Sequence, residues 1–246
     1  MKFDLSFNPP VMNAAGSLGF APGVRQQVAP ANLGAFVTNP VSLGRRDPAQ
    51  SRAAMAFPGG FILHSGYPNP GLKAVIHRHA ASWKRASIPV IVHLLAQFEN
   101  DIAAMVRLLE NIEGESGFEI GLPPEADSEL AAAMIRAGAG ELPVVARLPL
   151  ERALELGAIA IKAGAAAISL GPPRGALLDP EGRLLRGRIY GPALFPLALT
   201  SVLLLAENGI PVVGACGVYR PADVEAMLAA GALAVQLDTV LWRGWS

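Results

Sequence analysis

Short apolar runs, separated by stretches of helical periodicity, recur along the whole chain. Eight of these runs have the length of buried strands and are bounded by glycine, proline or small polar residues, as in a parallel sheet covered on both faces. They span residues 11–12, 35–38, 90–94, 117–122, 144–148, 167–170, 212–214 and 234–237. The pattern therefore predicts eight strands, most of them followed by a helix.

The segments between most of these runs place apolar residues three and four positions apart, which is typical of one helix face. Ser128 is a candidate cap for one of these helices. We expect helices over residues 69–82, 99–112, 128–137, 150–163, 192–208 and 221–229, and at best a short helix over residues 23–28. The irregular, Gly/Pro-rich segments 41–66 and 171–188 are predicted to be long excursion loops.

The closing stretch, residues 210–239, contains a complete βαβ unit. A buried strand leads into a glycine turn at Gly217, a helix starts at Pro221, and a second buried strand follows. Such a unit closes right-handed with its strands parallel. The glycines lie where a strand end meets a helix N-terminus, which is a natural anion site. Turn chemistry alone explains them equally well, and both interpretations stay open.

Eight alternations over about 250 residues match the usual size of a (β/α)₈ TIM barrel. We predict one such domain over residues 1–246, with an open doubly wound sheet as the structural alternative. Only residues 238–246 follow the last predicted strand, so the eighth helix is expected to be short or missing. Trp242 and Trp245 would then fill the apolar slot or meet a second subunit in a homo-oligomer.

The composition fits a single large core. The chain is 52% hydrophobic and 16% charged, with a mean hydropathy of +0.37. No apolar run reaches the ~18 residues that span a bilayer, and the first twenty residues do not form a secretory signal. The only cysteine, Cys216, excludes an intramolecular disulfide and fits a cytoplasmic location. Twenty Lys and Arg balance twenty Asp and Glu, which favours a small-molecule ligand over nucleic acid or membrane partners.

In a TIM barrel the chemistry lies at the carboxyl ends of the strands. Glu119 and Arg147 fall on neighbouring strands at comparable depth. They form either a structural ion pair or a general acid whose substrate is held by the arginine. His93 is either a hydrogen-bonded interior histidine or a base, and Cys216 has no evident base partner. No histidine has metal-ligand spacing, so no metal site is predicted. The polar residues expected at this end are Asn13, Ser17, Asn39, His93, Glu119, Arg147, Tyr190, Cys216 and Asp238.

Several short motifs occur in the order seen in one enzyme family. They include residues 8–16 (NPPVMNAAG), 69–71 (NPG), 88–92 (IPVIV), 142–145 (LPVV), 190–193 (YGPA) and 210–214 (IPVVG). On these motifs the chain resembles the dihydroorotate dehydrogenases over nearly its whole length. The resemblance implies a (β/α)₈ barrel that binds FMN at its mouth and oxidises dihydroorotate to orotate. The positions it implies for cofactor binding are Ala14, Ala15, Gly16, Asn39, Arg147, Gly191, Gly214, Gly217 and Thr239.

The departures from the family pattern concern the reaction itself. Asn39 and Arg147 stand where the family has lysines. Residues 121–124 (GLPP) offer no proton acceptor where the family has its Ser or Cys base. The substrate-binding asparagines are replaced by Leu63 or His64 and by Pro172.

Three further departures concern the flavin. Glycines of the family are replaced by Cys216, Asp238 and Arg188. A carboxylate at Asp238 would repel a phosphate dianion unless a proton or a cation intervened. The Arg188 side chain would enter the space of the flavin or supply that cation.

These residues lead to three hypotheses. The first is an FMN- or phosphate-ligand-binding barrel with a different oxidoreductase activity, for which no catalytic residue can be named. The second is a catalytically inactive barrel that acts as a binding or assembly subunit. The third and least favoured hypothesis is ordinary oxidation of dihydroorotate. That reaction removes a proton and a hydride from the substrate, and the base that would take the proton is missing.

Overall fold

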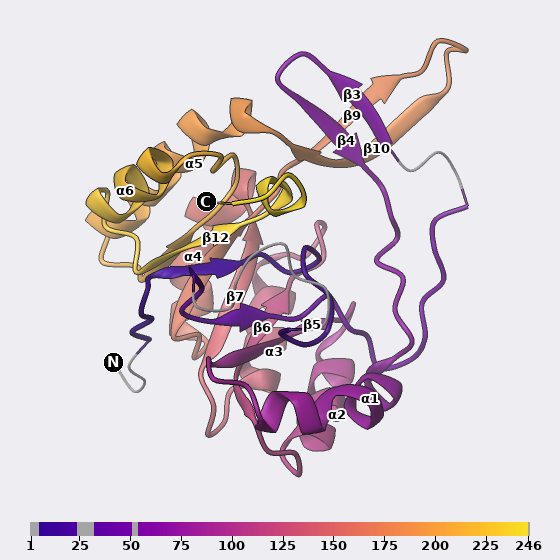
Figure 1. Cartoon of the computed structure of the whole chain (residues 1–246), viewed down its shortest axis with the longest axis vertical. Helices are drawn as coiled ribbons and strands as arrows, with labels where there is room; N and C mark the ends of the chain where they lie inside the picture. The colour runs from indigo at the N-terminus through magenta and orange to yellow at the C-terminus, as the bar shows by residue number, and fades with distance from the viewer. Residues whose placement is uncertain (1–4, 24–31, 51–53, 246) are drawn as a thin grey trace.

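The computed structural model describes residues 5–23, 32–50 and 54–245. Its centre is an eight-stranded parallel sheet, visible in Figure 1 behind the outer helices. The strands are β1 (Val11–Asn13), β2 (Phe36–Val37), β5 (Val90–Leu95), β6 (Glu115–Gly121), β7 (Val144–Pro149), β8 (Ala167–Gly171), β11 (Val212–Gly214) and β12 (Ala234–Leu237). All eight predicted strands are therefore confirmed.

The sheet closes on itself, so the fold is a (β/α)₈ TIM barrel and not an open doubly wound sheet. The strand order is β1-β12-β11-β8-β7-β6-β5-β2, and a parallel bridge between Met12 and Ala35 joins the two ends. Asn13 completes this seam: its amide donates to the Val37 carbonyl at 2.6 Å and accepts from the Val37 N–H at 2.9 Å. Two short strands thus close the barrel with the help of one buried side chain.

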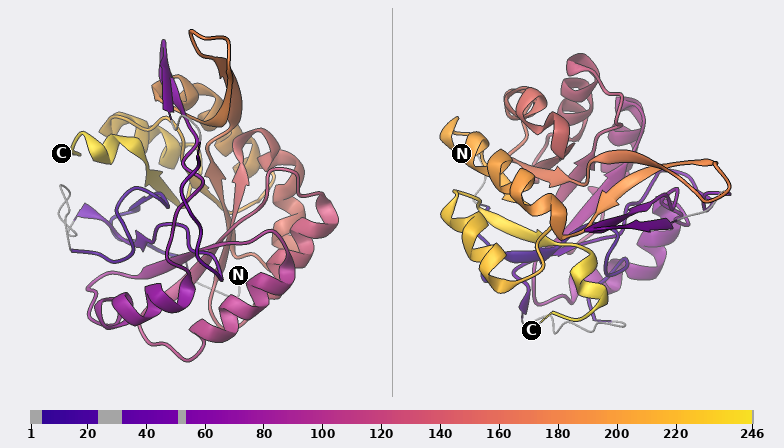
Figure 2. Two further views of the ribbon diagram at one scale, coloured as in Figure 1. Left: turned by 90° about the vertical axis from the view of Figure 1, so that its right-hand side faces the viewer. Right: turned by 90° about the horizontal axis from the view of Figure 1, so that it is seen from above.

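Helices cover the outside of the barrel, as Figure 2 shows from two further sides. They begin and end close to the predicted positions, although the helices predicted from residues 150 and 192 each open with a 3₁₀ turn, at Leu150–Arg152 and Pro192–Leu194. The predicted helix at residues 23–28 lies almost wholly outside the described residues. The α-helices are α1 (Leu72–Lys84), α2 (Glu99–Leu109), α3 (Ser128–Gly138), α4 (Ala153–Lys162), α5 (Phe195–Glu207) and α6 (Pro221–Ala229).

The predicted cap of α3 was wrong by one residue. Asp127, not Ser128, occupies the cap position, and its carboxylate accepts a hydrogen bond from the Leu130 N–H at 2.8 Å. Aspartate and serine are comparable caps, so the sequence alone did not separate the two neighbours.

The two predicted excursion loops instead contain a second sheet. The strands β3 (Ala54–Phe57) and β4 (Gly60–Leu63) come from the first segment, and β9 (Arg174–Leu178) and β10 (Leu184–Tyr190) from the second. They form one antiparallel sheet in the order β3-β4-β10-β9, which projects at the upper right of Figure 1. The loop prediction was wrong because each hairpin is stabilised by pairing with the other, far along the chain.

The chain after β12 continues as a 3₁₀ helix, Thr239–Trp242, and no α-helix follows within the described residues, in line with the expected short or missing eighth helix. Trp242 is 49% exposed and its indole N–H donates to the Ser17 carbonyl at 3.2 Å. Trp245 packs half-buried against the main hydrophobic core. These tryptophans therefore contact the barrel, and a role in a homo-oligomer stays a prediction.

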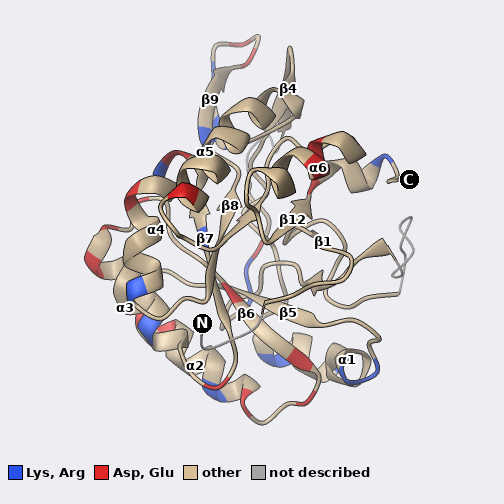
Figure 3. Cartoon of the chain, turned by 90° about the vertical axis from the view of Figure 1, so that its left-hand side faces the viewer, with Lys and Arg blue, Asp and Glu red and all other residues tan. Residues whose placement is uncertain are grey.

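Charged residues are distributed over the outer helices with both signs mixed, as Figure 3 shows for α2, α3 and α4. Among the described residues, no helix is both long enough and apolar enough to cross a membrane. The same part of the chain holds no group of three or more potential metal ligands.

Candidate functional site at the carboxyl ends of the barrel strands

A buried carboxylate forms the centre of the barrel interior. Glu119 lies on β6, is 1% exposed, and accepts hydrogen bonds from four other strands. His93 Nδ1 on β5 lies 2.6 Å and Arg147 Nη1 on β7 lies 3.3 Å from its Oε2. Ser169 Oγ on β8 lies 2.7 Å and Gln236 Nε2 on β12 lies 2.6 Å from its Oε1. Both oxygens of the carboxylate are therefore satisfied by partners on rigid elements.

The partners of Glu119 also determine its charge. Burial by itself would raise the pKa of Glu119, but Arg147, His93 and Gln236 together hold that pKa well below its usual range. Burial lowers the pKa of His93, and the nearby Arg147 adds to this, although the hydrogen bond to Glu119 opposes it. At neutral pH the group is then an ionised carboxylate, a charged arginine and a neutral histidine. The ion pair expected from the sequence is formed, and its carboxylate is not poised to act as an acid.

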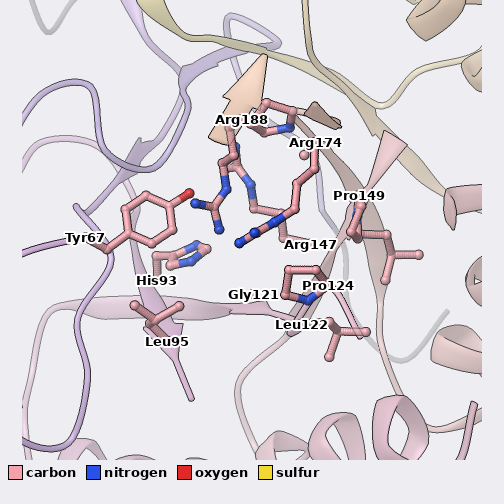
Figure 4. Close-up of a pocket in the computed structure, with 13 residues that line it drawn as sticks. Tyr67, His93, Leu95, Gly121, Leu122, Pro124, Arg147, Pro149, Arg174 and Arg188 are labelled. Atoms are coloured by element: carbon pink, nitrogen blue, oxygen red, sulfur yellow. The ribbon is translucent and has the colours of Figure 1, made fainter. Parts of the chain in front are cut away.

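Above this cluster the mouth contains a pocket lined by three arginines, which we call the arginine pocket. Arg147 reaches it from β7, Arg174 from β9 and Arg188 from β10, and their guanidinium groups point toward one another in Figure 4. Tyr67 and His93 line the same pocket. The guanidinium carbon of Arg188 lies 4.1 Å from the centre of the Tyr67 ring, a cation–π contact that holds the side chain in place.

A second cavity, of about 290 Å³, lies beside the arginine pocket and is called here the small-residue cavity. Its floor includes Ala15 and Gly16, at the carboxyl end of β1, and its walls include Tyr67, Tyr190 and Trp242. Of the residues that the sequence implied for cofactor binding, it brings together Ala15, Gly16, Asn39 and Thr239. Ala14 is next to them but only 2% exposed.

The other implied residues lie elsewhere. Arg147 lines the arginine pocket, and Gly191 lines a separate surface cavity with the β3–β4 turn. Gly214 and Gly217 serve close packing: a Cβ would lie 2.4 Å from Met227 Sδ at Gly214 and 2.4 Å from the Phe195 N at Gly217. The sequence left open whether Gly217 belongs to an anion site or only to a turn. The structure shows directly that a tight turn requires glycine at this position.

The backbone donors of the last two turns are used by carboxylates of this chain. Asp238 accepts hydrogen bonds from the Thr239 N–H and from Thr239 Oγ1. The Tyr219 hydroxyl lies 2.7 Å from the same Thr239 Oγ1. At the start of α6, Asp223 Oδ2 accepts from the N–H groups of Tyr219 and Arg220, both at 3.0 Å. Asp238 and Arg188 form no ion pair; Arg188 instead lies on Tyr67.

Asn39 and Cys216, two further candidates, have well-defined surroundings. Asn39 Oδ1 accepts from the Gly19 N–H at 3.0 Å, which fixes the segment after β1. Cys216 is 2% exposed, and burial raises the pKa of its thiol far above the usual range. Its φ of 75° is a conformation that favours glycine. A buried, protonated thiol is a poor nucleophile, so Cys216 has no catalytic feature in this arrangement.

The closed barrel defines the fold as a TIM barrel, and its two cavities lie at the carboxyl ends of the strands, where such barrels carry their sites. A family model for dihydroorotate dehydrogenase matches residues 2–122. The chain is 27% identical to the catalytic subunit of dihydroorotate dehydrogenase B (NAD(+)) from Pelobacter propionicus, over 96% of this chain and 84% of that protein. It is also 27% identical to the Pyrococcus abyssi protein of the same name, over 99% and 88%.

A crystal structure of dihydroorotate dehydrogenase from Eimeria tenella matches the fold with a TM-score of 0.73. It covers 95% of this chain and 76% of that one, at 14% sequence identity. The chain is therefore similar in sequence to the dihydroorotate dehydrogenase family, and it shares that family's fold.

The residues at the phosphate end do not fit the FMN that this family implies. The resemblance implies that the flavin phosphate lies over the turns at Gly217 and Thr239, but the Asp238 carboxylate already accepts from the Thr239 N–H and hydroxyl. Burial raises the pKa of Asp238, opposed by its Thr239 hydrogen bonds, and no cation is ion-paired with it in the described part of the chain. The ring end is less restricted, because Ala15 and Gly16 face the small-residue cavity.

Sequence reasoning missed Tyr67 and Arg174. Tyr67 follows the first segment that was predicted to be a loop, and Arg174 lies in the second; the pairing of β4 with β10 brings these two segments together. The sequence of β9, RGALL, does not alternate polar and apolar residues, so no period-two signal indicated a strand there.

Proposed function

We propose that this chain is a dihydroorotate dehydrogenase-like barrel that binds a small molecule at its mouth and has lost or altered the family's ordinary oxidation. The observation that carries the proposal is the capped turn after β12, where Asp238 uses the donors that a flavin phosphate would need. This supports the second hypothesis from the sequence, a barrel that acts by binding.

The segment after β6 supports the same proposal. Leu122, Pro123 and Pro124 lie there and cannot accept a proton, and Leu122 and Pro124 line the arginine pocket. The nearby Glu119 is fully hydrogen-bonded below them. Oxidation of dihydroorotate needs a base on one face of the substrate, and the family's position for that base is apolar in this chain.

The experiment combines a flavin titration with an activity assay. We expect the purified protein to gain no bound-flavin absorbance with FMN and to give no dihydroorotate-dependent reduction of an artificial electron acceptor, with or without FMN. Turnover of dihydroorotate at rates typical of enzymes, about 1 s⁻¹ or more, would contradict the proposal.

A variant tests whether Asp238 is the obstacle. In Asp238→Gly the Thr239 donors become free, and we expect the affinity for FMN or inorganic phosphate to rise by about tenfold or more. Asp47→Asn is the matched control, because Asp47 is an exposed aspartate paired with Arg45 and distant from this turn in the sequence. Equal behaviour of the two variants would remove the role assigned to Asp238.

One observation favours the other candidate, an FMN-dependent oxidoreductase with altered activity. The small-residue cavity has Ala15 and Gly16 on its floor and aromatic side chains on its walls, a surface that suits a flat ring. Stoichiometric binding of FMN by the unmodified protein would favour this candidate over the first.

A further inference from the structure

The geometry points to a binding site for a small organic anion, a phosphate monoester or a carboxylate, in the arginine pocket; this inference rests on the proposed function of a ligand-binding barrel. The site is formed by Arg147, Arg174 and Arg188, which come from three different strands. Two of these strands belong to the projecting sheet, so the site exists only where that sheet meets the barrel mouth.

The charges in the pocket do not balance. Arg147 is paired with Glu119 beneath it. Neither Arg174 nor Arg188 is ion-paired with a carboxylate of the described residues, yet both point into the same space in Figure 4. Guanidinium groups that converge without a counter-ion repel one another, and an anion between them would turn this repulsion into charge-assisted hydrogen bonds.

Arg188 is already held in position for such a ligand. Its guanidinium group lies over the Tyr67 ring, with 4.1 Å between the guanidinium carbon and the ring centre. Stacking uses the face of the guanidinium and leaves the N–H groups at its edge available as donors. The side-chain freedom that a bound anion would otherwise restrict is therefore reduced before binding.

The size of the space limits the ligand. The arginine pocket encloses about 40 Å³, and it adjoins a wider outer cavity of about 350 Å³ that shares Arg174, Arg188 and Tyr67. A water molecule needs roughly 10–15 Å³ on this measure, so the inner part suits a compact head group of a few atoms. Phe98, Leu122 and Leu130 line the outer cavity and suit a small, partly apolar body.

The test measures binding of inorganic phosphate and, separately, of malonate by titration calorimetry. We expect saturable binding of at least one of them to the unmodified protein, with a dissociation constant of about 1 mM or tighter. Arg174→Gln and Arg188→Gln should each weaken it about tenfold or more. Arg174 is exposed on the edge strand β9, so its variant is expected to keep the fold, which circular dichroism checks.

Arg186→Gln is the matched control, because Arg186 is an exposed arginine on the same strand as Arg188 and does not line the pocket. Its binding should equal that of the unmodified protein. Absence of saturable binding for both anions, or equal weakening in Arg186→Gln, would overturn the inference. Dihydroorotate turnover in the separate assay would contradict the proposed function but leave this binding result unaffected, so the two failures are distinguishable.

Discussion

Glu119 is the residue whose surroundings the structure defines most completely. Replacing it by glutamine removes the carboxylate that is ion-paired with the buried Arg147. We expect Glu119→Gln to lower the free energy of unfolding by about 3–5 kcal/mol, the cost of leaving a buried charge unpaired. Urea unfolding followed by circular dichroism measures this.

A second substitution tests whether the lost stability comes from the unpaired charge of Arg147. Arg147→Gln in the Glu119→Gln background should recover part of the lost stability, because both charges are then absent. Glu155→Gln removes an exposed partner of Arg152 and should have a small effect. A loss in Glu119→Gln no larger than in Glu155→Gln would contradict the prediction.

The same cluster predicts how stability depends on pH. The pKa of His93 is lowered by burial, so below the unfolded value of about 6.5 the unfolded chain binds a proton that the native state does not. The pKa of Glu119 is also lowered, despite its burial, by Arg147 and His93, so a second loss begins below the unfolded value of about 4.3. Stability should therefore fall as the pH drops through both ranges.

Urea midpoints measured between neutral and acidic pH check this dependence. In Glu119→Gln the fall below about pH 4.3 should become shallower, because the glutamine does not titrate. An unchanged acid slope in that variant would show that other carboxylates are responsible.

At the residue scale the sequence predicted part of the site. Glu119 and Arg147 were predicted as neighbours because parallel strands in consecutive order fix their relative depth, and they do pair. Tyr67 and Arg174 could not be predicted, since no local pattern states which distant segment a projecting hairpin will contact.

At the scale of the elements, the pairing of β4 with β10 positions the pocket. A Cβ at Gly187 would lie 2.6 Å from the Leu63 carbonyl oxygen and 2.7 Å from Ile62 Cγ2. We expect Gly187→Ala to separate these strands and to cost about 1–3 kcal/mol. Hydrogen exchange should show reduced protection in the sheet β3-β4-β10-β9 while the barrel strands keep theirs.

Arg186→Gln serves as the control for this substitution as well, because its side chain is exposed on the same strand. Protection equal to that of the unmodified protein in both variants would mean that the strands tolerate a methyl group at Gly187. Loss of protection in the barrel strands too would mean that the projecting sheet and the barrel unfold together.

The elements also show where pattern reading succeeds. The buried strands β5 and β7 are apolar apart from His93 and Arg147, so their sequence and their environment largely agree. The strands of the projecting sheet are partly exposed, and β4 pairs with β10 across more than a hundred residues of chain. Propensity is weak for such strands, so their sequences resemble loops.

At the scale of the molecule, the larger of two hydrophobic clusters in the described residues draws its members from most of the chain, from Ala21 to Leu241. Trp83 is buried within it and donates its indole N–H to the Phe20 carbonyl at 2.7 Å. We expect the barrel to unfold in one cooperative transition, with the same urea midpoint by tryptophan fluorescence and by circular dichroism. Two separate midpoints would contradict a single cooperative unit.

The sequence by itself determined the barrel, because eight buried strands alternating with amphipathic helices have few ways to cover their apolar faces. It also led to the prediction that other residues occupy the reactive positions of the family it resembles, since that prediction requires only the order of the motifs. The tertiary structure alone decided that Asp238 caps its own turn and that three arginines face one pocket. Those facts depend on side-chain directions and on contacts between segments far apart in the chain, which no local pattern contains.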